Sequence, residues 1–317
     1  MNGRRGRERQ QVVGGGRKHR GRGEIALKFA KMHGLGNNYI YVNLWEETLA
    51  QETLAPLAIA ISNVNTGIGS DGLITMGPSA VADARMRIFN EDGSEGQNCG
   101  NGLRCVGKYL YEKGIVASER LTIETKGGLM RLELHLSADA AIVEEVTVDM
   151  GEPGLNRRQL PMLGGDPNGT AIETVVDVAD RQFVVTGVSM GNPHAVLFVD
   201  DAAQADVLGV GPAIERHELF PERVNVEFVS VNTSRDMDFR VWERGSGVTM
   251  ACGTGACAAV VAGVLTGRLE RGETVVVHLQ GGDLRIAWQP DGHVYMTGPA
   301  AWICEGEWLS EQARVGE

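Results

Sequence analysis

The sequence contains one short motif twice, in the same register. Cys99-Gly100-Asn101-Gly102 recurs as Cys252-Gly253-Thr254-Gly255, displaced by 153 positions. The residues ahead of each copy keep this spacing, because Arg87-Ile88-Phe89 corresponds to Arg240-Val241-Trp242 at the same displacement. A repeat of this kind constrains the fold strongly, since each half of the chain must build the same local structure around its own cysteine. We expect two half-domains that present two thiols to one site.

A helix is predicted directly after each cysteine. In the first copy, apolar residues recur at helical spacing at Leu103, Val106 and Leu110, and Gly114 ends the pattern. The second helix runs from Cys252 to Gly267 and is apolar on all sides. A helix that is apolar all round belongs in a core, so each cysteine is expected at the start of a central helix.

Strands are predicted around both helices, with two further helical segments at residues 54–63 and 211–220. The predicted strands cover residues 25–32, 39–44, 73–76, 86–90, 121–125, 130–136, 143–150, 171–178, 182–188, 195–199, 224–231, 237–242, 274–279, 284–288 and 294–297. The predicted fold class is therefore α/β, of the α+β type. It comprises two similar domains, each a mostly antiparallel sheet wrapped around a central apolar helix, related by internal pseudo-symmetry. We place the boundary at the glycines near residue 151, giving domains at 24–150 and 151–317, with the last strand free to return to the first domain.

Residues 1–23 differ in composition from the rest of the chain. They hold eight basic residues against Glu8 alone, a charge of +7, which leaves −18 for residues 24–317 out of the total of −11. We interpret this basic, glycine-rich stretch as a disordered tail, with polyanion binding as the alternative. The acidic body argues against a nucleic-acid function for the fold, and no run of 18 apolar residues predicts a membrane span.

The cysteine pattern favours a reduced, cytoplasmic protein without a metal site. Five cysteines, an odd number in a long chain, do not form a disulfide framework. Spacings of six between Cys99 and Cys105, and of five between Cys252 and Cys257, do not match metal-binding motifs. Cys105, Cys257 and Cys304 are expected to be small buried apolar residues.

A cysteine at a helix N-terminus acquires specific chemistry. The free backbone N–H groups form an anion site suited to a carboxylate, and the glycines allow the backbone to approach a ligand closely. The helix dipole favours thiolate by roughly 0.3–1 kcal/mol. Two thiols that share a site titrate as a coupled pair, and repulsion favours one thiolate with one thiol. That mixed state is what inversion of a carbon centre needs.

Other readings of the repeated motif remain open at this point. A phosphate-binding loop lacks its Gly-Lys-Ser/Thr sequence here. A cysteine protease would need a Cys/His/Asn triad, which would leave the duplication unexplained. Polar residues at predicted strand ends are candidate ligands or turn residues: Asn37, Asn90, Asn192 and Asn225. Glu243-Arg244 offers a carboxylate acceptor beside a planar donor for a carboxylate, or a surface ion pair. His194 alone would be structural.

The combined motifs resemble those of the diaminopimelate epimerase family. They are Lys31-Met32-His33-Gly34-Leu35-Gly36-Asn37, Arg87-Ile88-Phe89-Asn90 with Asp92-Gly93-Ser94-Glu95, Cys99-Gly100-Asn101-Gly102, Gly191-Asn192-Pro193-His194, and Trp242-Glu243-Arg244-Gly245 with Ala251-Cys252-Gly253-Thr254-Gly255. The resemblance runs from about Lys28 to Glu307. It implies an epimerase that converts L,L-diaminopimelate to the meso form for lysine and peptidoglycan synthesis, without a cofactor or a metal. It further implies a cytoplasmic homodimer acting on a small molecule, with no nucleic-acid or membrane partner.

The resemblance also implies roles for particular residues. Cys99 and Cys252 match the two acid/base cysteines, and His194 and Glu243 match positions that tune them. The matches to substrate-binding positions are Asn37, Asn90, Gly100, Asn101, Asn192, Asn225, Glu243, Arg244, Gly253 and Thr254. The chain departs from many relatives at Asn38-Tyr39, at Gly72 in place of a substrate-binding Gln, and at Val248 in place of a Glu.

Two other functions share part of this pattern. A proline or hydroxyproline racemase of the same fold also uses two cysteines, and Glu243-Arg244 discriminates, because a second amino-carboxylate end needs its own charged partners. A non-catalytic binding relative would not need both thiols.

Overall fold

The computed structural model describes residues 25–310, so the predicted tail at 1–23 lies outside the described residues. The helices are η1 (Gln51–Thr53), α1 (Leu54–Ser62), α2 (Gly100–Glu112), η2 (Ala202–Gln204), α3 (Val207–Glu215) and α4 (Gly253–Leu265). The strands of the first half are β1 (Ile25–Gly34), β2 (Asn37–Asn43), β3 (Gly72–Gly77), β4 (Ala84–Asn90), β5 (Glu95–Gly96), β6 (Arg120–Thr125), β7 (Gly128–Leu136) and β8 (Val143–Asp149). The later strands are β9 (Thr174–Val178), β10 (Arg181–Ser189), β11 (Pro193–Phe198), β12 (Asn225–Thr233), β13 (Asp236–Glu243), β14 (Gly247–Val248), β15 (Thr274–Leu279), β16 (Gly282–Trp288), β17 (Val294–Pro299) and β18 (Ala301–Ser310).

The strand pairing repeats between the two halves. In the first half, β1–β2 is antiparallel, β2–β3 parallel, β3–β4 antiparallel, β4–β6 parallel, and β6–β7–β8 antiparallel. The second half gives the same series with β10–β11, β11–β12, β12–β13, β13–β15 and β15–β16–β17. The predicted fold class is therefore confirmed, because two mostly antiparallel sheets of one topology are built from the two copies of the motif.

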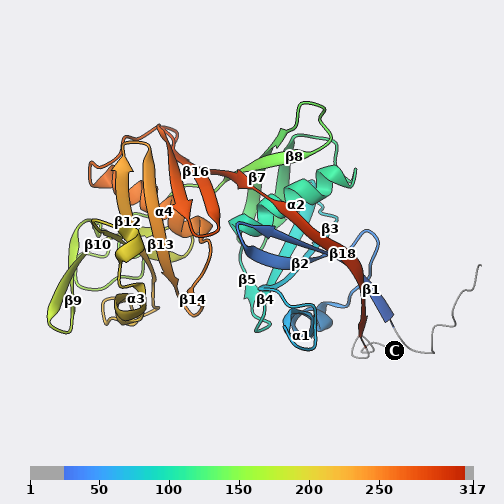
Figure 1. The fold of residues 1–317 in the computed structure, drawn as a ribbon, viewed down its shortest axis with the longest axis horizontal. Helices are drawn as coiled ribbons and strands as arrows, with labels where there is room; N and C mark the ends of the chain where they lie inside the picture. Colours follow the sequence, from blue (N-terminus) through green and yellow to red (C-terminus); the bar gives the residue numbers. More distant parts are fainter. Residues whose placement is uncertain (1–24, 311–317) are drawn as a thin grey trace, which may run out of the picture.

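Two strand pairs connect the halves. β17 lies antiparallel to β8, which joins the two sheets edge to edge. β18 then crosses from the second half and pairs antiparallel with β1, with nine residues of β1 in register. Figure 1 shows this strand as the long arrow running from the lobe around α4 to the lobe around α2. β9 occupies the matching place beside β10, so the chain's last strand completes the first sheet as β9 completes the second.

The cysteine helices lie at the centre of the two lobes (Figure 1). α4 is buried from Gly253 to Gly263 with only Thr254 partly exposed, as expected for a helix that is apolar all round. α2 is buried over its first eleven residues but carries two charged side chains inside, Arg104 and Lys108. The Lys108 ammonium bonds the carboxylate of Glu112 at 2.7 Å and the carbonyl of Val143 at 2.6 Å. One apolar core surrounds both helices without a break, so the domain division at residue 151 stays a prediction.

The two outer helices cover smaller cores. α1 packs on β3 and β4, and α3 packs on β12 and β13. Of the segment at 211–220 expected to be partly helical, residues 211–215 belong to α3, which begins earlier. The helix begins at Val207 because the Asp206 side chain accepts a hydrogen bond from the Gly209 N–H at 3.0 Å and caps it.

Candidate active site

The two repeated cysteines occupy equivalent positions as helix caps. Cys99 precedes α2 and Cys252 precedes α4, both with extended backbone angles. The Cys99 sulfur accepts a hydrogen bond from the Gly102 N–H at 3.4 Å, and the Cys252 sulfur accepts one from the Gly255 N–H at 3.4 Å. Each sulfur therefore takes the place of the usual oxygen in an N-cap, at the positive end of its helix dipole.

The starts of the two helices meet at one place. Asn101 Nδ2 donates to the carbonyl of Ala251, the residue before Cys252, at 3.4 Å. A β-carbon at Gly100 would lie 2.5 Å from the Met296 methyl group, and one at Gly253 would lie 2.9 Å from the Met296 sulfur. Both glycines thus allow the helix starts to pack against the same side chain of β17. The Glu243 carboxylate influences the pKa of both Cys99 and Cys252, which places it within electrostatic reach of both thiols.

Cys99 has two asparagines as neighbours. Its sulfur donates to Asn37 Oδ1 at 3.7 Å, and Asn101 Nδ2 donates to the same oxygen at 3.1 Å. Asn37 is held in turn by Asp71, whose carboxylate accepts from Asn37 Nδ2 at 2.7 Å and from the Asn38 N–H at 2.7 Å. The orientation of the Asn37 amide is therefore fixed from both ends.

A buried guanidinium lies behind Cys99. Arg104 is fully buried and donates to Asn101 Oδ1 at 3.0 Å and to the carbonyl of Pro299 at 3.1 Å. Burial raises the pKa of Cys99, while the Gly102 N–H and the Arg104 charge act to lower it.

A chain of side chains extends from Cys252 into the second half. The sulfur lies 3.6 Å from the Thr254 hydroxyl, which accepts from Asn192 Nδ2 at 3.2 Å. Asn192 Oδ1 lies 3.0 Å from His194 Nε2, and His194 Nδ1 lies 2.6 Å from Glu227 Oε1. Both His194 and Glu227 are fully buried.

Acidic groups dominate the electrostatics of Cys252. Burial raises its pKa well above the usual range, and the charges of Glu243 and Glu227 raise it further. Burial also raises the pKa of Glu243, opposed by hydrogen bonds from Thr249 and Cys252. Burial thus raises the pKa of both thiols, and the Arg104 charge opposes this rise at Cys99 whereas carboxyl groups add to it at Cys252.

The remaining candidate ligands lie at strand ends or just beyond them. Asn225 Nδ2 donates to the carbonyl of Pro193 at 3.0 Å, and its Oδ1 accepts from the Arg244 N–H at 2.8 Å. Arg244 is exposed, and its guanidinium donates to the carbonyl of Glu222 at 3.0 Å. Asn90 bonds within its own turn, to the Ser94 hydroxyl at 2.9 Å.

Sequence reasoning missed three groups that hold this arrangement: Asp71, Arg104 and Glu227. Arg104 and Glu227 carried a signal, since each is a charged residue inside a segment otherwise patterned for burial.

The backbone explains why glycine stands at position 72. Gly72 has φ +155°, and a β-carbon there would lie 2.1 Å from the carbonyl oxygen of Phe89, so this backbone does not accommodate a glutamine.

The prediction that all three remaining cysteines are buried is wrong for one of them. Cys105 and Cys257 are buried, and burial raises their pKa to about 11 and about 12. Cys304 is exposed and lies on β18, the strand that crosses between the two halves. The apolar pattern did not predict this strand.

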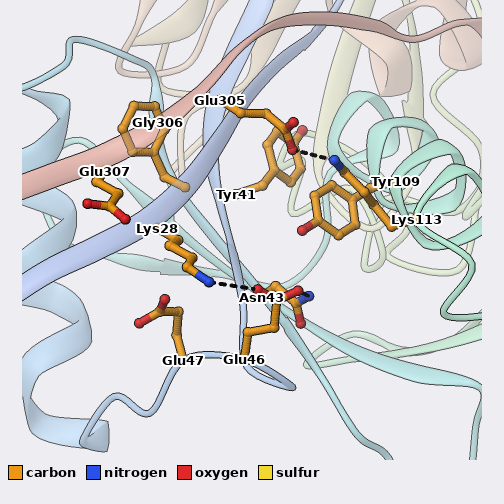
Figure 2. Close-up of a pocket in the computed structure, with 11 residues that line it drawn as sticks. Lys28, Tyr41, Asn43, Glu46, Glu47, Tyr109, Lys113, Glu305, Gly306 and Glu307 are labelled. Atoms are coloured by element: carbon orange, nitrogen blue, oxygen red, sulfur yellow. Dashed lines mark hydrogen bonds and ion pairs between the residues drawn. The ribbon is translucent and has the colours of Figure 1, made fainter. Parts of the chain in front are cut away.

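A cavity of about 410 Å³ opens at the other end of α2 (Figure 2). Ion pairs between Lys28 and Glu46 and between Lys113 and Glu305 line it. Lys113 follows the last residue of α2, whereas Cys99 precedes the first, so the two sites are roughly 20 Å apart along the helix axis. This cavity is therefore separate from the thiols.

Residues 25–310 contain neither a metal-binding cluster nor a membrane-spanning helix. Within that range no cluster of three or more histidine, cysteine or acidic side chains could hold a metal ion. No helix there is long and apolar enough to cross a membrane.

The chain matches a known family along most of its length. The diaminopimelate epimerase family model matches residues 29–155 and 186–303. The diaminopimelate epimerase of Geobacillus sp. (strain WCH70) is 56% identical over 280 residues, covering 88% of this chain and 98% of its own. That of Bacillus cereus (strain AH187) is 54% identical over 280 residues, covering 88% and 96%.

Solved structures with the same fold have distant sequences. A hydroxyproline epimerase from Agrobacterium vitis matches with a TM-score of 0.65 at 14% identity, covering 90% of this chain and 93% of its own. A phenazine biosynthesis protein of the PhzF family from Bacillus anthracis gives 0.64 at 17% identity, covering 90% and 100%. These likenesses show the fold alone. The family model and the near relatives show more, and this chain belongs to the diaminopimelate epimerase family.

Proposed function

We propose that this chain interconverts L,L-diaminopimelate and meso-diaminopimelate by two-thiol proton transfer, supplying lysine and peptidoglycan precursor. Relatives that are more than half identical over nearly their whole length carry the name of this activity. The observation that carries the mechanism is the meeting of two cysteine-capped helices, joined by the bond from Asn101 to the carbonyl of Ala251.

Inversion of an α-carbon needs a base on one face and an acid on the other. Cys99 and Cys252 supply the two groups, and positioned acid–base catalysis of this kind contributes about 10²–10⁴-fold. The Arg104 charge acts to lower the pKa of Cys99, whereas burial and the Glu243 carboxyl group raise the pKa of Cys252. Once Cys99 is a thiolate, it removes the α-proton and Cys252 delivers one to the opposite face. The return reaction exchanges the roles. Since the two thiols supply both proton transfers, the reaction needs no cofactor.

The helix starts are suited to the reacting carboxylate. Gly100-Asn101 and Gly253-Thr254 form the first turns of α2 and α4, whose free backbone N–H groups and dipoles favour an anion. The second amino-carboxylate end of the substrate then takes its partners from the surrounding loops. We assign these roles to Asn37, Asn90, Asn192, Asn225, Glu243 and Arg244. His194 and Glu243 tune the thiols.

The decisive experiment is an assay of purified reduced protein on L,L-diaminopimelate, with a chelator and without pyridoxal phosphate. Formation of the meso isomer, absent in Cys99→Ala, would support the proposal. L-proline and trans-4-hydroxy-L-proline are the competing substrates. Turnover of either in preference to diaminopimelate would move the chain to the proline racemase type of activity.

We further propose that the enzyme is a cytoplasmic homodimer. A reduced compartment keeps both catalytic thiols free. Exposed apolar side chains on β18, Ile303 and Leu309, favour a covered surface. Light scattering on the eluted protein measures the mass directly, and a mass near one chain of 34.0 kDa would contradict the dimer.

A further inference from the structure

The chain of side chains behind Cys252 ends in a buried carboxyl group that no proton-transfer step uses. We propose that Glu227 is a positioning residue: it fixes the hydrogen on His194 Nε2 and, through Asn192, aims the Thr254 hydroxyl at the Cys252 sulfur. The inference rests on the proposed function only for the role of Cys252 as an acid/base.

The direction of each hydrogen bond follows from the one before it. Thr254 accepts from Asn192 Nδ2, so the other end of that amide, Oδ1, faces His194 Nε2 as an acceptor. Nε2 must therefore carry a hydrogen. Because the Thr254 oxygen already accepts, its own hydrogen is free to point to the Cys252 sulfur 3.6 Å away. A donor at this position stabilises the thiolate whenever Cys252 releases its proton.

Glu227 determines which nitrogen of His194 carries that hydrogen. Its Oε1 lies 2.6 Å from Nδ1, so one proton must lie between these two atoms. If the proton is on Nδ1, the pair is imidazolium and carboxylate; if it is on Oε1, both groups are neutral. In either case Nε2 keeps its hydrogen and the pair has no net charge.

The burial of Glu227 agrees with a shared proton. The side chain is fully buried on β12, and among residues 25–310 its Oε2 has no hydrogen-bond partner. Burial raises the pKa of Glu227, while the neighbouring His194 acts to lower it. A carboxylate with one bare oxygen would be costly to hold in this position without a proton nearby.

Three neighbouring strands carry titratable side chains close to Cys252. β11 presents His194, β12 presents Glu227, and β13 presents Glu243, whose carboxyl group has the Cys252 side chain as a hydrogen-bond partner. α4 itself supplies the Gly255 N–H. The Thr254 hydroxyl is thus the side-chain donor available to the sulfur, and its orientation depends on the chain that ends at Glu227.

Two roles for Glu227 predict opposite changes at Cys252. If Glu227 acted only as a negative charge, both Glu227→Gln and Glu227→Met would make the Cys252 thiolate easier to form. If Glu227 positions His194, the glutamine amide can still donate to Nδ1 and preserve the chain, whereas methionine cannot. Only Glu227→Met should then make the thiolate harder to form.

The test is alkylation of each cysteine by iodoacetamide, without substrate, followed across pH by peptide mass spectrometry. In Glu227→Met, we expect alkylation of Cys252 at neutral pH to slow roughly fivefold. In Glu227→Gln it should stay within about twofold of wild type. Cys99, in the same sample, should not change. Faster alkylation of Cys252 in either variant, or equal slowing in both, would overturn the proposal.

Variants of Thr254, at the other end of this series of hydrogen bonds, control for misfolding. Thr254→Val should slow Cys252 alkylation as Glu227→Met does, and Thr254→Ser should restore it. The double variant Glu227→Met/Thr254→Val should be no slower than either single variant, because both act on one hydrogen bond. Additive slowing would contradict a shared path. Thiol reactivity is measured without diaminopimelate, so this result stands apart from whether the chain epimerises it.

Discussion

Asn101 of α2 donates a hydrogen bond to the carbonyl of Ala251, 150 positions away and directly before Cys252. The same amide nitrogen donates to Asn37 Oδ1, the oxygen that accepts from Cys99. One side chain is thus in contact with the surroundings of both thiols. This contact relates the two copies of the motif in space, as the displacement of 153 relates them in sequence.

Removal of either thiol should abolish epimerisation. We expect Cys99→Ala and Cys252→Ala each to lower kcat by about 10³-fold or more, because each removes one of two obligatory proton-transfer groups. Cys304→Ala, at an exposed position on β18, is the matched control and should keep full activity. The measurement is the conversion of L,L- to meso-diaminopimelate. Substantial turnover by either single-thiol variant would exclude the mechanism.

Oxidation should inactivate the enzyme reversibly. The two helix starts pack against one side chain, Met296, so we expect Cys99 and Cys252 to reach disulfide distance when no substrate lies between them. Activity should fall in air and return with dithiothreitol. Mass spectrometry should identify a Cys99–Cys252 bridge, and modification of Cys304 alone in the inactive protein would count against it.

The buried guanidinium should set the acid side of the pH profile. Arg104 lowers the pKa of Cys99, so Arg104→Met should raise that pKa and move the acid limb of kcat/KM to higher pH. Activity near pH 7 should fall roughly tenfold and recover in alkaline buffer. The variant also leaves Asn101 Oδ1 and the carbonyl of Pro299 without their buried donor, so some loss of thermal stability should accompany the shift.

Lys108→Met is the control for this prediction. Lys108 is the other buried cation of α2 but bonds Glu112 and the carbonyl of Val143, away from the thiol. It should lower thermal stability and leave the pH profile in place. A profile that moves equally in both variants would mean that Arg104 acts through the fold and not through its charge.

Arg244 should matter through its planar shape. We expect Arg244→Lys to lower kcat/KM by at least tenfold, because an ammonium cannot bind a carboxylate with two parallel hydrogen bonds. Arg223→Lys is the matched control, since Arg223 pairs with Glu215 at 3.6 Å. Steady-state kinetics on L,L-diaminopimelate measure both. Unchanged kinetics in Arg244→Lys would remove this residue from the substrate site.

The parts of the fold that could be predicted from sequence are those encoded by local pattern. Helical spacing after Cys99 and Cys252 predicted α2 and α4, and alternation predicted most strands within a few residues. β18 was missed, because its exposed side chains, including Cys304 and Ile303, do not alternate like those of a half-buried strand.

The supporting residues of the site depend on tertiary pairing, which no local pattern encodes. His194 meets Glu227 only because β11 and β12 run in parallel with His194 opposite Asn225. Asp71 reaches Asn37 across β2 and β3 in the same way. The cysteines were predictable because their chemistry is repeated in sequence, whereas their partners come from strands that are separated by 30 or more positions.

Isotope incorporation tests the two-thiol account most directly. Started from L,L-diaminopimelate in D2O, the reaction should place deuterium at the inverted carbon of the meso product, because the acid thiol has exchanged its proton with solvent. The unreacted L,L pool should gain little deuterium at early times. A single base acting on both faces would return much of the original hydrogen. Early meso product that keeps its original hydrogen at the inverted carbon would contradict the assignment of Cys99 and Cys252 as two separate acid/base groups.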